Sequence, residues 1–159
     1  MKVFISHQQA DALMAAQVAR RLLTVHGIAS YLDVIDPYVN GSAESLAEHI
    51  RSEMGKCTQL LAVVSSATLA SQWVPWEVGV ATEKNFPLAT YTGTYAPPPE
   101  FLRKWPYLKN DSDLDAYARA SLSARNFRNT YKNYSTDSAA GGRAATSYFF
   151  TELRRSIGQ

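Results

Sequence analysis

The sequence predicts an α/β domain built on an open, doubly wound parallel sheet with helices on both faces. Short apolar runs alternate with segments of helical periodicity through the first 91 residues. The connections between them are short, which favours parallel strands joined by crossover helices. Hydrophobic residues make up 46% of the 159 residues and charged residues 19%, values typical of one globular domain with a buried core.

Four short apolar runs are the expected strands. The run 59–65 (QLLAVVS) is the most apolar, which is typical of a central parallel strand buried on both faces. The other expected strands are residues 2–5, 28–32 and 86–91.

Helical periodicity marks the segments between and after these strands. Residues 12–25 form the first expected helix, and Gly27 stands where a left-handed residue would end it. Its apolar stripe is expected to contain Leu13, Ala16, Val18, Ala19, Leu22 and Leu23. The further expected helical segments are 45–54, 66–72 continued by 75–84, a short turn within 101–108, 114–126 and 146–157, with a loop over 135–142.

Several function classes are disfavoured by composition and by missing motifs. A net charge of +2 is too small to indicate nucleic-acid binding, and no apolar stretch approaches the ~20 residues that span a bilayer. Cys57 is the only cysteine, so no internal disulfide can form, and we expect a cytoplasmic protein. The three histidines have no metal-ligand spacing, and no glycine-rich phosphate loop is present. We therefore expect no metal and no bound cofactor.

Polar residues follow the expected strands at the sheet edge where ligands bind in such folds. Ser6 and His7 end the first strand, and a helix cap from Ser6 or Asp11 explains them equally well. Asp33 follows the second strand and opens the loop 33–42, which also fits a plain surface loop.

The segment 71–77 (SQWVPWE) combines an indole with a carboxylate. In a helix, Trp73 and Glu77 share one face because they are four residues apart. A carboxylate beside a flat apolar wall suits glycosidic cleavage, in which positive charge builds on the sugar ring. From spacing alone, the commoner roles of such a pair are packing for the tryptophan and a favourable interaction of the carboxylate with the dipole at the helix start.

Together, three segments resemble the Toll/interleukin-receptor (TIR) family. Residues 3–7 (VFISH) resemble its first box, 31–33 (YLD) with the loop to Gly41 its second box, and 71–77 the segment that carries the catalytic glutamate. The resemblance covers about residues 1–91 and is strongest to stand-alone bacterial TIR proteins of Thoeris antiphage defence (ThsB-like). It implies a flavodoxin-like sheet, with the TIR core at about 1–110 and a helical C-terminal extension at about 111–159 of a single domain.

The resemblance also implies a site and a reaction. NAD would be the substrate rather than a cofactor, and Glu77 would stabilise the ribosyl cation as nicotinamide leaves. The residues implied to bind the dinucleotide are Ser6, His7, Gln8, Asp33, Asp36, Tyr38 and Trp73. A cyclic ADP-ribose-type product read by a separate effector protein, and a homo-oligomer that completes the site, would follow from the same resemblance.

The sequence departs from the family pattern in places. His7 stands where many relatives have an aromatic residue, and the segment from Pro97 onward is longer than a minimal TIR domain. Two alternatives to an NAD-cleaving enzyme remain open, namely a non-catalytic TIR adaptor and an enzyme related to nucleoside deoxyribosyltransferases.

Overall fold

The computed structural model describes residues 1–32, 43–132 and 138–159. Within them lies one all-parallel sheet with the strand order β2-β1-β3-β4-β5. The strands are β1 (Lys2–Ser6), β2 (Ala29–Leu32), β3 (Gln59–Val63), β4 (Leu88–Tyr91) and β5 (Tyr107–Leu108). The α/β fold class and the four expected strands are confirmed, whereas β5 lies where only a helical turn was predicted.

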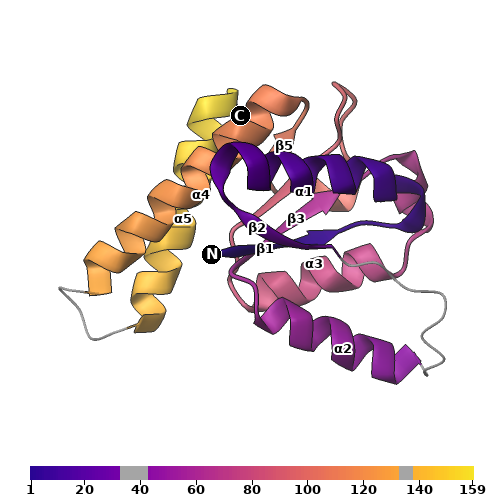
Figure 1. Cartoon of the computed structure of the whole chain (residues 1–159), viewed down its shortest axis with the longest axis horizontal. Coiled ribbons are helices and arrows are strands. Elements are labelled where there is room, and N and C mark those ends of the chain that lie inside the picture. The colour runs from indigo at the N-terminus through magenta and orange to yellow at the C-terminus, as the bar shows by residue number, and fades with distance from the viewer. Residues whose placement is uncertain (33–42, 133–137) are drawn as a thin grey trace.

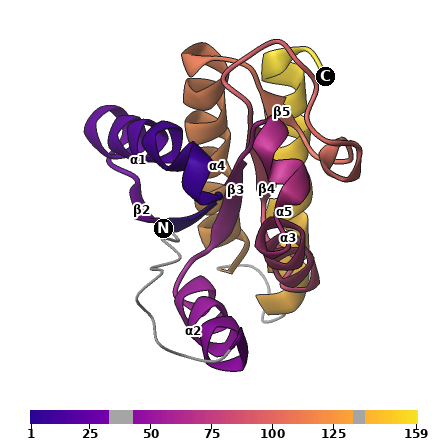
Figure 2. The same cartoon turned by 90° about the vertical axis from the view of Figure 1, so that its right-hand side faces the viewer.

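Helices cover both faces of the sheet (Figures 1 and 2). The helices are α1 (Ala12–His26), α2 (Ala43–Gly55), α3 (Trp73–Glu83), α4 (Asp111–Lys132) and α5 (Ser138–Ile157). The described residues also contain three short 3-10 helices, η1 (Gln9–Asp11), η2 (Ser66–Ala70) and η3 (Glu100–Leu102). Two apolar cores result, one between the sheet and α1, α4 and α5, and one between the sheet and α2 and α3.

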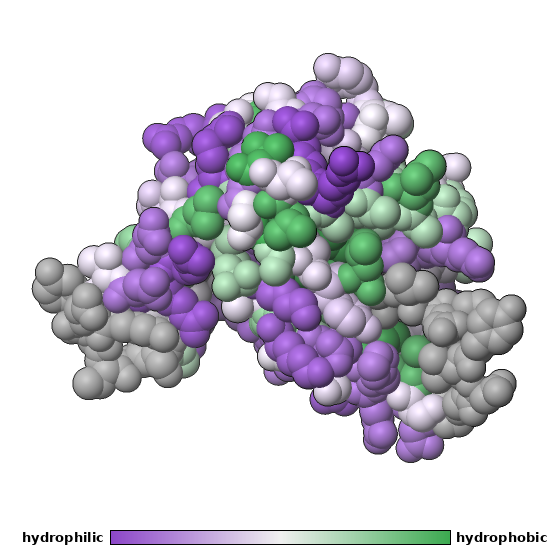
Figure 3. All heavy atoms as spheres, viewed as in Figure 1, coloured by the Kyte–Doolittle hydropathy of each residue, from purple (hydrophilic) through white to green (hydrophobic). Residues whose placement is uncertain are grey.

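Helix α1 ends as the sequence predicts, but it faces the core differently. Gly27 adopts the left-handed conformation at φ 64°, and its N–H reaches the carbonyls of the last turn. The buried residues of α1 are Ala15, Val18 and Leu22. Leu13, Ala16 and Leu23 were wrongly assigned to the buried stripe, since all three are exposed, Leu13 by 75% and Leu23 by 58%. Isolated apolar patches accordingly lie among polar side chains over α1 (Figure 3).

Two other helix predictions need correction. The region 66–84 is not one continuous helix, because η2 ends at Ala70 and α3 begins at Trp73. The expected loop 135–142 is wrong over 138–142, where α5 has already begun, and its residues 135–137 lie outside the described part of the chain. A Cβ on Gly141 would lie 2.9 Å from the ring of Tyr131, so a residue without a side chain allows α5 to approach α4 here.

The two C-terminal helices pack side by side as a hairpin (Figure 1) and contribute to the main core. Tyr117 of α4 and Phe149 of α5 are both completely buried. Their rings meet edge to face at a centroid distance of 5.7 Å. Both belong to the cluster that contains Val3 and Ile5 of strand β1, so the hairpin completes the core on this face of the sheet.

A charged network joins α1 to α4 at the border of this core. The Arg21 guanidinium donates two hydrogen bonds to the Asp115 carboxylate, at 2.9 and 2.8 Å. His26 Nε2 lies 2.8 Å from the same carboxylate. The hydrogen bonds from Arg21 are the main reason that the pKa of Asp115 falls from 3.8 to about 2.

We expect this network to make the free energy of unfolding depend on pH in the acid range. Because the pKa of Asp115 is lower in the folded chain, its contribution is fully present above pH 3.8 and is lost as the pH falls towards 2. The loss should be about 1–2 kcal/mol in the free energy of unfolding, since partial exposure screens the pair. Denaturant unfolding measured over this pH range should show the slope in the wild type and lose most of it in Asp115→Asn. Asp111→Asn, which removes a more exposed contact of Arg21, should retain the slope.

Candidate functional site

The carboxyl edge of the sheet brings together two residues that the sequence predicted to act in one site. Ser6 ends β1, and its hydroxyl donates a short hydrogen bond to Glu77 Oε2 on α3. The two residues are 71 positions apart, and both are completely buried. The fold therefore places the predicted carboxylate directly beside the end of the first box.

Two further predicted residues lie in the turn that follows β1. His7 is buried, and its Nδ1 lies 3.3 Å from the Ile5 carbonyl oxygen. Gln8 is half-buried and precedes η1. Its side-chain Nε2 is buried and has no hydrogen-bond partner among residues 1–32, 43–132 and 138–159. The turn thus presents an unused amide donor close in sequence to Ser6.

Trp73 begins α3, one helical turn before Glu77, as the four-residue spacing requires. Its ring is half-buried and meets the ring of Trp76 edge to face, with centroids 5.6 Å apart. Trp73 also packs against the core beneath α3. The indole pair gives the first turn of α3 an apolar surface, and Glu77 follows Trp73 by one helical turn.

A hydrogen-bond network that the sequence did not predict holds the edge together. Thr68 of η2 donates to Asp11 Oδ2 at 3.3 Å, and both residues are buried. Thr68 Oγ1 also accepts from the backbone N–H of Ser65, whose own hydroxyl caps η2. This network ties the turn after β1 to the turn after β3. Neither Ser6 nor Asp11 makes the side-chain helix cap that the sequence allowed, because both side chains bond across the sheet edge instead.

Three of the predicted substrate-binding residues lie outside the described part of the chain. They are Asp33, Asp36 and Tyr38, all within the second-box loop. Their assignment to the site stays a prediction.

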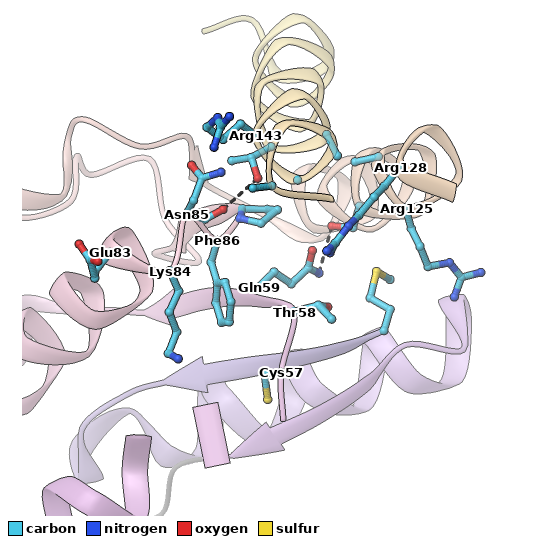
Figure 4. A pocket seen from close by; sticks show the side chains of 18 residues that line it. Cys57, Thr58, Gln59, Glu83, Lys84, Asn85, Phe86, Arg125, Arg128 and Arg143 are labelled. Carbon is cyan, nitrogen blue, oxygen red and sulfur yellow. Dashed lines mark hydrogen bonds between the residues drawn. The ribbon is translucent and has the colours of Figure 1, made fainter. Parts of the chain in front are cut away.

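Complete burial of Glu77 sets a condition on any chemistry at this edge. A substrate can reach the carboxylate only if the Ser6–Glu77 contact becomes accessible. A cavity of about 650 Å³ lies at the opposite, amino edge of the sheet (Figure 4), and none of the predicted site residues lines it. That cavity cannot be the route by which a substrate meets Glu77.

Two negative findings concern the described segments. Nowhere in them do three or more His, Cys, Asp or Glu side chains converge in a way that could hold a metal ion. None of their helices is long and apolar enough to cross a membrane.

Comparison with known proteins gives the family. No curated protein matches the chain. Among solved structures, the TIR domains of the activated Roq1 resistosome that recognises the pathogen effector XopQ are 18% identical. That match covers 94% of this chain and 83% of the other, at a TM-score of 0.45. The family model "TIR domain" matches residues 3–121, which is most of the chain and reaches into α4. The chain therefore belongs to the TIR domain family.

Proposed function

We propose that this TIR domain cleaves the bond between nicotinamide and ribose in NAD, with Glu77 as the catalytic residue. The observation that supports this most is the hydrogen bond between Ser6 and Glu77, which sets a carboxylate at the carboxyl edge of the sheet. Trp73, one turn away, supplies an apolar surface of the kind that a nicotinamide ring would contact. The unused amide of Gln8 offers a donor to a polar substrate.

The reaction needs a carboxylate more than any other group. As the C1′–N bond breaks, its electron pair leaves with nicotinamide and positive charge develops on the ribose ring. A carboxylate held in a low-dielectric setting stabilises that charge strongly. Water attacking C1′ releases a proton and gives ADP-ribose, whereas attack by an adenine nitrogen or a ribose hydroxyl gives a cyclic isomer.

We propose the cyclic, signalling outcome, with a separate effector protein that responds to the nucleotide in bacterial antiphage immunity. We also propose that self-association in the cytoplasm completes the site, as the resemblance implies. Both proposals rest on the resemblance to stand-alone bacterial TIR proteins.

A second candidate function is a non-catalytic TIR domain that acts by assembling with other TIR domains. One observation favours it: Glu77 has no exposed surface and is bonded to Ser6, as a purely structural carboxylate would be. The two functions differ in whether NAD is consumed.

The test is incubation of the purified full chain with NAD over a range of protein concentrations. Chromatography should detect free nicotinamide, with a rate that rises more steeply than protein concentration if assembly opens the site. Mass spectrometry of the other product separates ADP-ribose from a cyclic isomer, which is lighter by one water. Absence of nicotinamide at every concentration would leave the assembly function as the better account.

Ser6→Ala provides a further prediction about the same pair. Removing one hydrogen bond to a charged group costs about 1.5 kcal/mol, so we expect kcat to fall roughly tenfold. KM should hardly change, because the Ser6 hydroxyl contacts the carboxylate. Steady-state kinetics on Ser6→Ala, with the exposed Ser66→Ala as control, distinguishes this positioning role from direct binding of the dinucleotide, which would raise KM instead.

A further inference from the structure

The contact between Ser6 and Glu77 belongs to a longer series of hydrogen bonds around the carboxyl edge of the sheet. After Ser6 the chain turns through Gln8, whose carbonyl oxygen accepts from the backbone N–H of Asp11 at 2.8 Å. The Asp11 carboxylate in turn accepts from the Thr68 hydroxyl at 3.3 Å. The turn that follows Ser6 is therefore bonded to η2 through side chains other than Glu77.

A second series of hydrogen bonds connects η2 to α3, the helix that carries Glu77. The Thr68 carbonyl oxygen accepts from the backbone N–H of Ser71 at 3.0 Å. The Ser71 hydroxyl accepts from the backbone N–H of Val74 at 3.2 Å, in the first turn of α3. Glu77 follows Val74 by three residues, so the two lie on one face of the helix, and both are buried. The position of Thr68 thus bears on that of Glu77 through two hydrogen bonds and one helical turn.

The bond between Asp11 and Thr68 is the buried link between these two series. Asp11 is 4% exposed and Thr68 is 0% exposed. Because Thr68 Oγ1 accepts from the backbone N–H of Ser65 at 3.0 Å, its own proton is available for Asp11. Hydrogen bonds shielded from water are electrostatically stronger than exposed ones. The ring of contacts closes at the Ser6–Glu77 bond, so two independent connections hold the end of β1 against α3.

We propose that Asp11 and Thr68 are positioning residues, which hold α3 so that the Glu77 carboxylate stays beside the end of β1. The inference rests on the proposed function, because it concerns the same carboxylate. A displacement of about 1 Å in a reacting group can cost about 10²-fold in rate. Loss of the Asp11–Thr68 bond should therefore lower kcat, and KM should hardly change because neither side chain is assigned a contact with NAD.

The first test is steady-state kinetics of nicotinamide release by the full chain. Thr68→Val removes the hydroxyl and nearly keeps the shape of the side chain, and we expect kcat to fall about tenfold with KM within about twofold of the wild type. Thr68→Ser, which retains a hydroxyl, should restore most of the wild-type kcat. Ser71→Ala opens the same ring at a half-buried residue and should also lower kcat, so the test does not depend on the folding of Thr68→Val.

Thr146→Val is the matched control. Thr146 is also buried, and its hydroxyl donates to the Asn85 carbonyl oxygen at 2.9 Å, at the amino edge of the sheet (Figure 4, beside Asn85). Its loss should lower Tm as Thr68→Val does, while kcat stays at the wild-type value. A purely structural role of Thr68 would give the two variants the same kinetics.

Hydrogen exchange followed by mass spectrometry makes the test independent of catalysis. Thr68→Val should speed exchange at the backbone amides of residues 71–77 and leave residues 18–26 of α1 as in the wild type. The proposal is overturned if Thr68→Val and Ser71→Ala both release nicotinamide at the wild-type rate, if Thr146→Val slows the reaction as much, or if exchange at 71–77 is unchanged. A wild type that releases no nicotinamide would remove the proposed function, and exchange at 71–77 would still decide whether the Asp11–Thr68 bond holds α3.

Discussion

Glu77→Gln should reduce the release of nicotinamide from NAD by at least about 10²–10³-fold, the usual effect of removing one group that stabilises charge in the transition state. The substitution keeps the shape of the side chain and an oxygen that can accept the hydrogen bond from Ser6. What it removes is the negative charge that would face the ribosyl cation. The measurement is kcat from nicotinamide release, with the thermal unfolding midpoint recorded for the same samples.

Glu83→Gln is the matched control for this variant. Glu83 lies at the other end of α3 and is exposed, so its loss should leave the rate unchanged. Equal rates for the wild type and Glu77→Gln, with both proteins folded, would remove Glu77 from the mechanism.

Phe149→Ala should lower the free energy of unfolding by about 3–5 kcal/mol, the usual cost of emptying a buried aromatic site. Phe149 is completely buried and packs on Tyr117 and Phe150, so its removal leaves a cavity between α4 and α5. The expected fall in Tm is on the order of 10 °C. Denaturant unfolding followed by circular dichroism and by tryptophan fluorescence measures both the size and the cooperativity of the loss.

The same variant tests whether the C-terminal hairpin is part of one cooperative unit. All three tryptophans lie outside the hairpin, at positions 73, 76 and 105, so their fluorescence reports on the sheet and on α3. We expect both signals to shift together. Phe101→Ala, at a residue that is 41% exposed, should cost less than about 1.5 kcal/mol. Two separate transitions would show instead that the hairpin unfolds independently of the sheet.

The sequence predicts the central part of the fold well because burial there leaves a strong pattern. All five residues of β3 are buried, and the same run is the most apolar in the chain. Gly27 marks the end of α1 because the left-handed conformation favours glycine.

The elements that were missed have weak local patterns. Strand β5 is only two residues long, Tyr107–Leu108, and it is specified by pairing with β4. The first turn of α5 contains small residues that resemble a loop, and tertiary packing against α4 decides its helical state.

The candidate site was likewise predicted only in part from the sequence. Ser6 and Glu77 were predicted from separate segments, and the parallel sheet brings them into contact. The bond between Asp11 and Thr68 joins two side chains 57 positions apart, and no periodicity or motif marks such a pair.

The central claim is that the Glu77 carboxylate meets the nicotinamide ribose, although the single chain buries it. A crystal structure of Glu77→Gln with NAD, which this variant should bind but not cleave, tests the claim most directly. We predict that the side chain at position 77 lies within hydrogen-bond distance of the nicotinamide ribose hydroxyls, with the Trp73 indole beside the nicotinamide. NAD bound elsewhere, with position 77 still enclosed against Ser6 while the wild type cleaves NAD, would contradict the account.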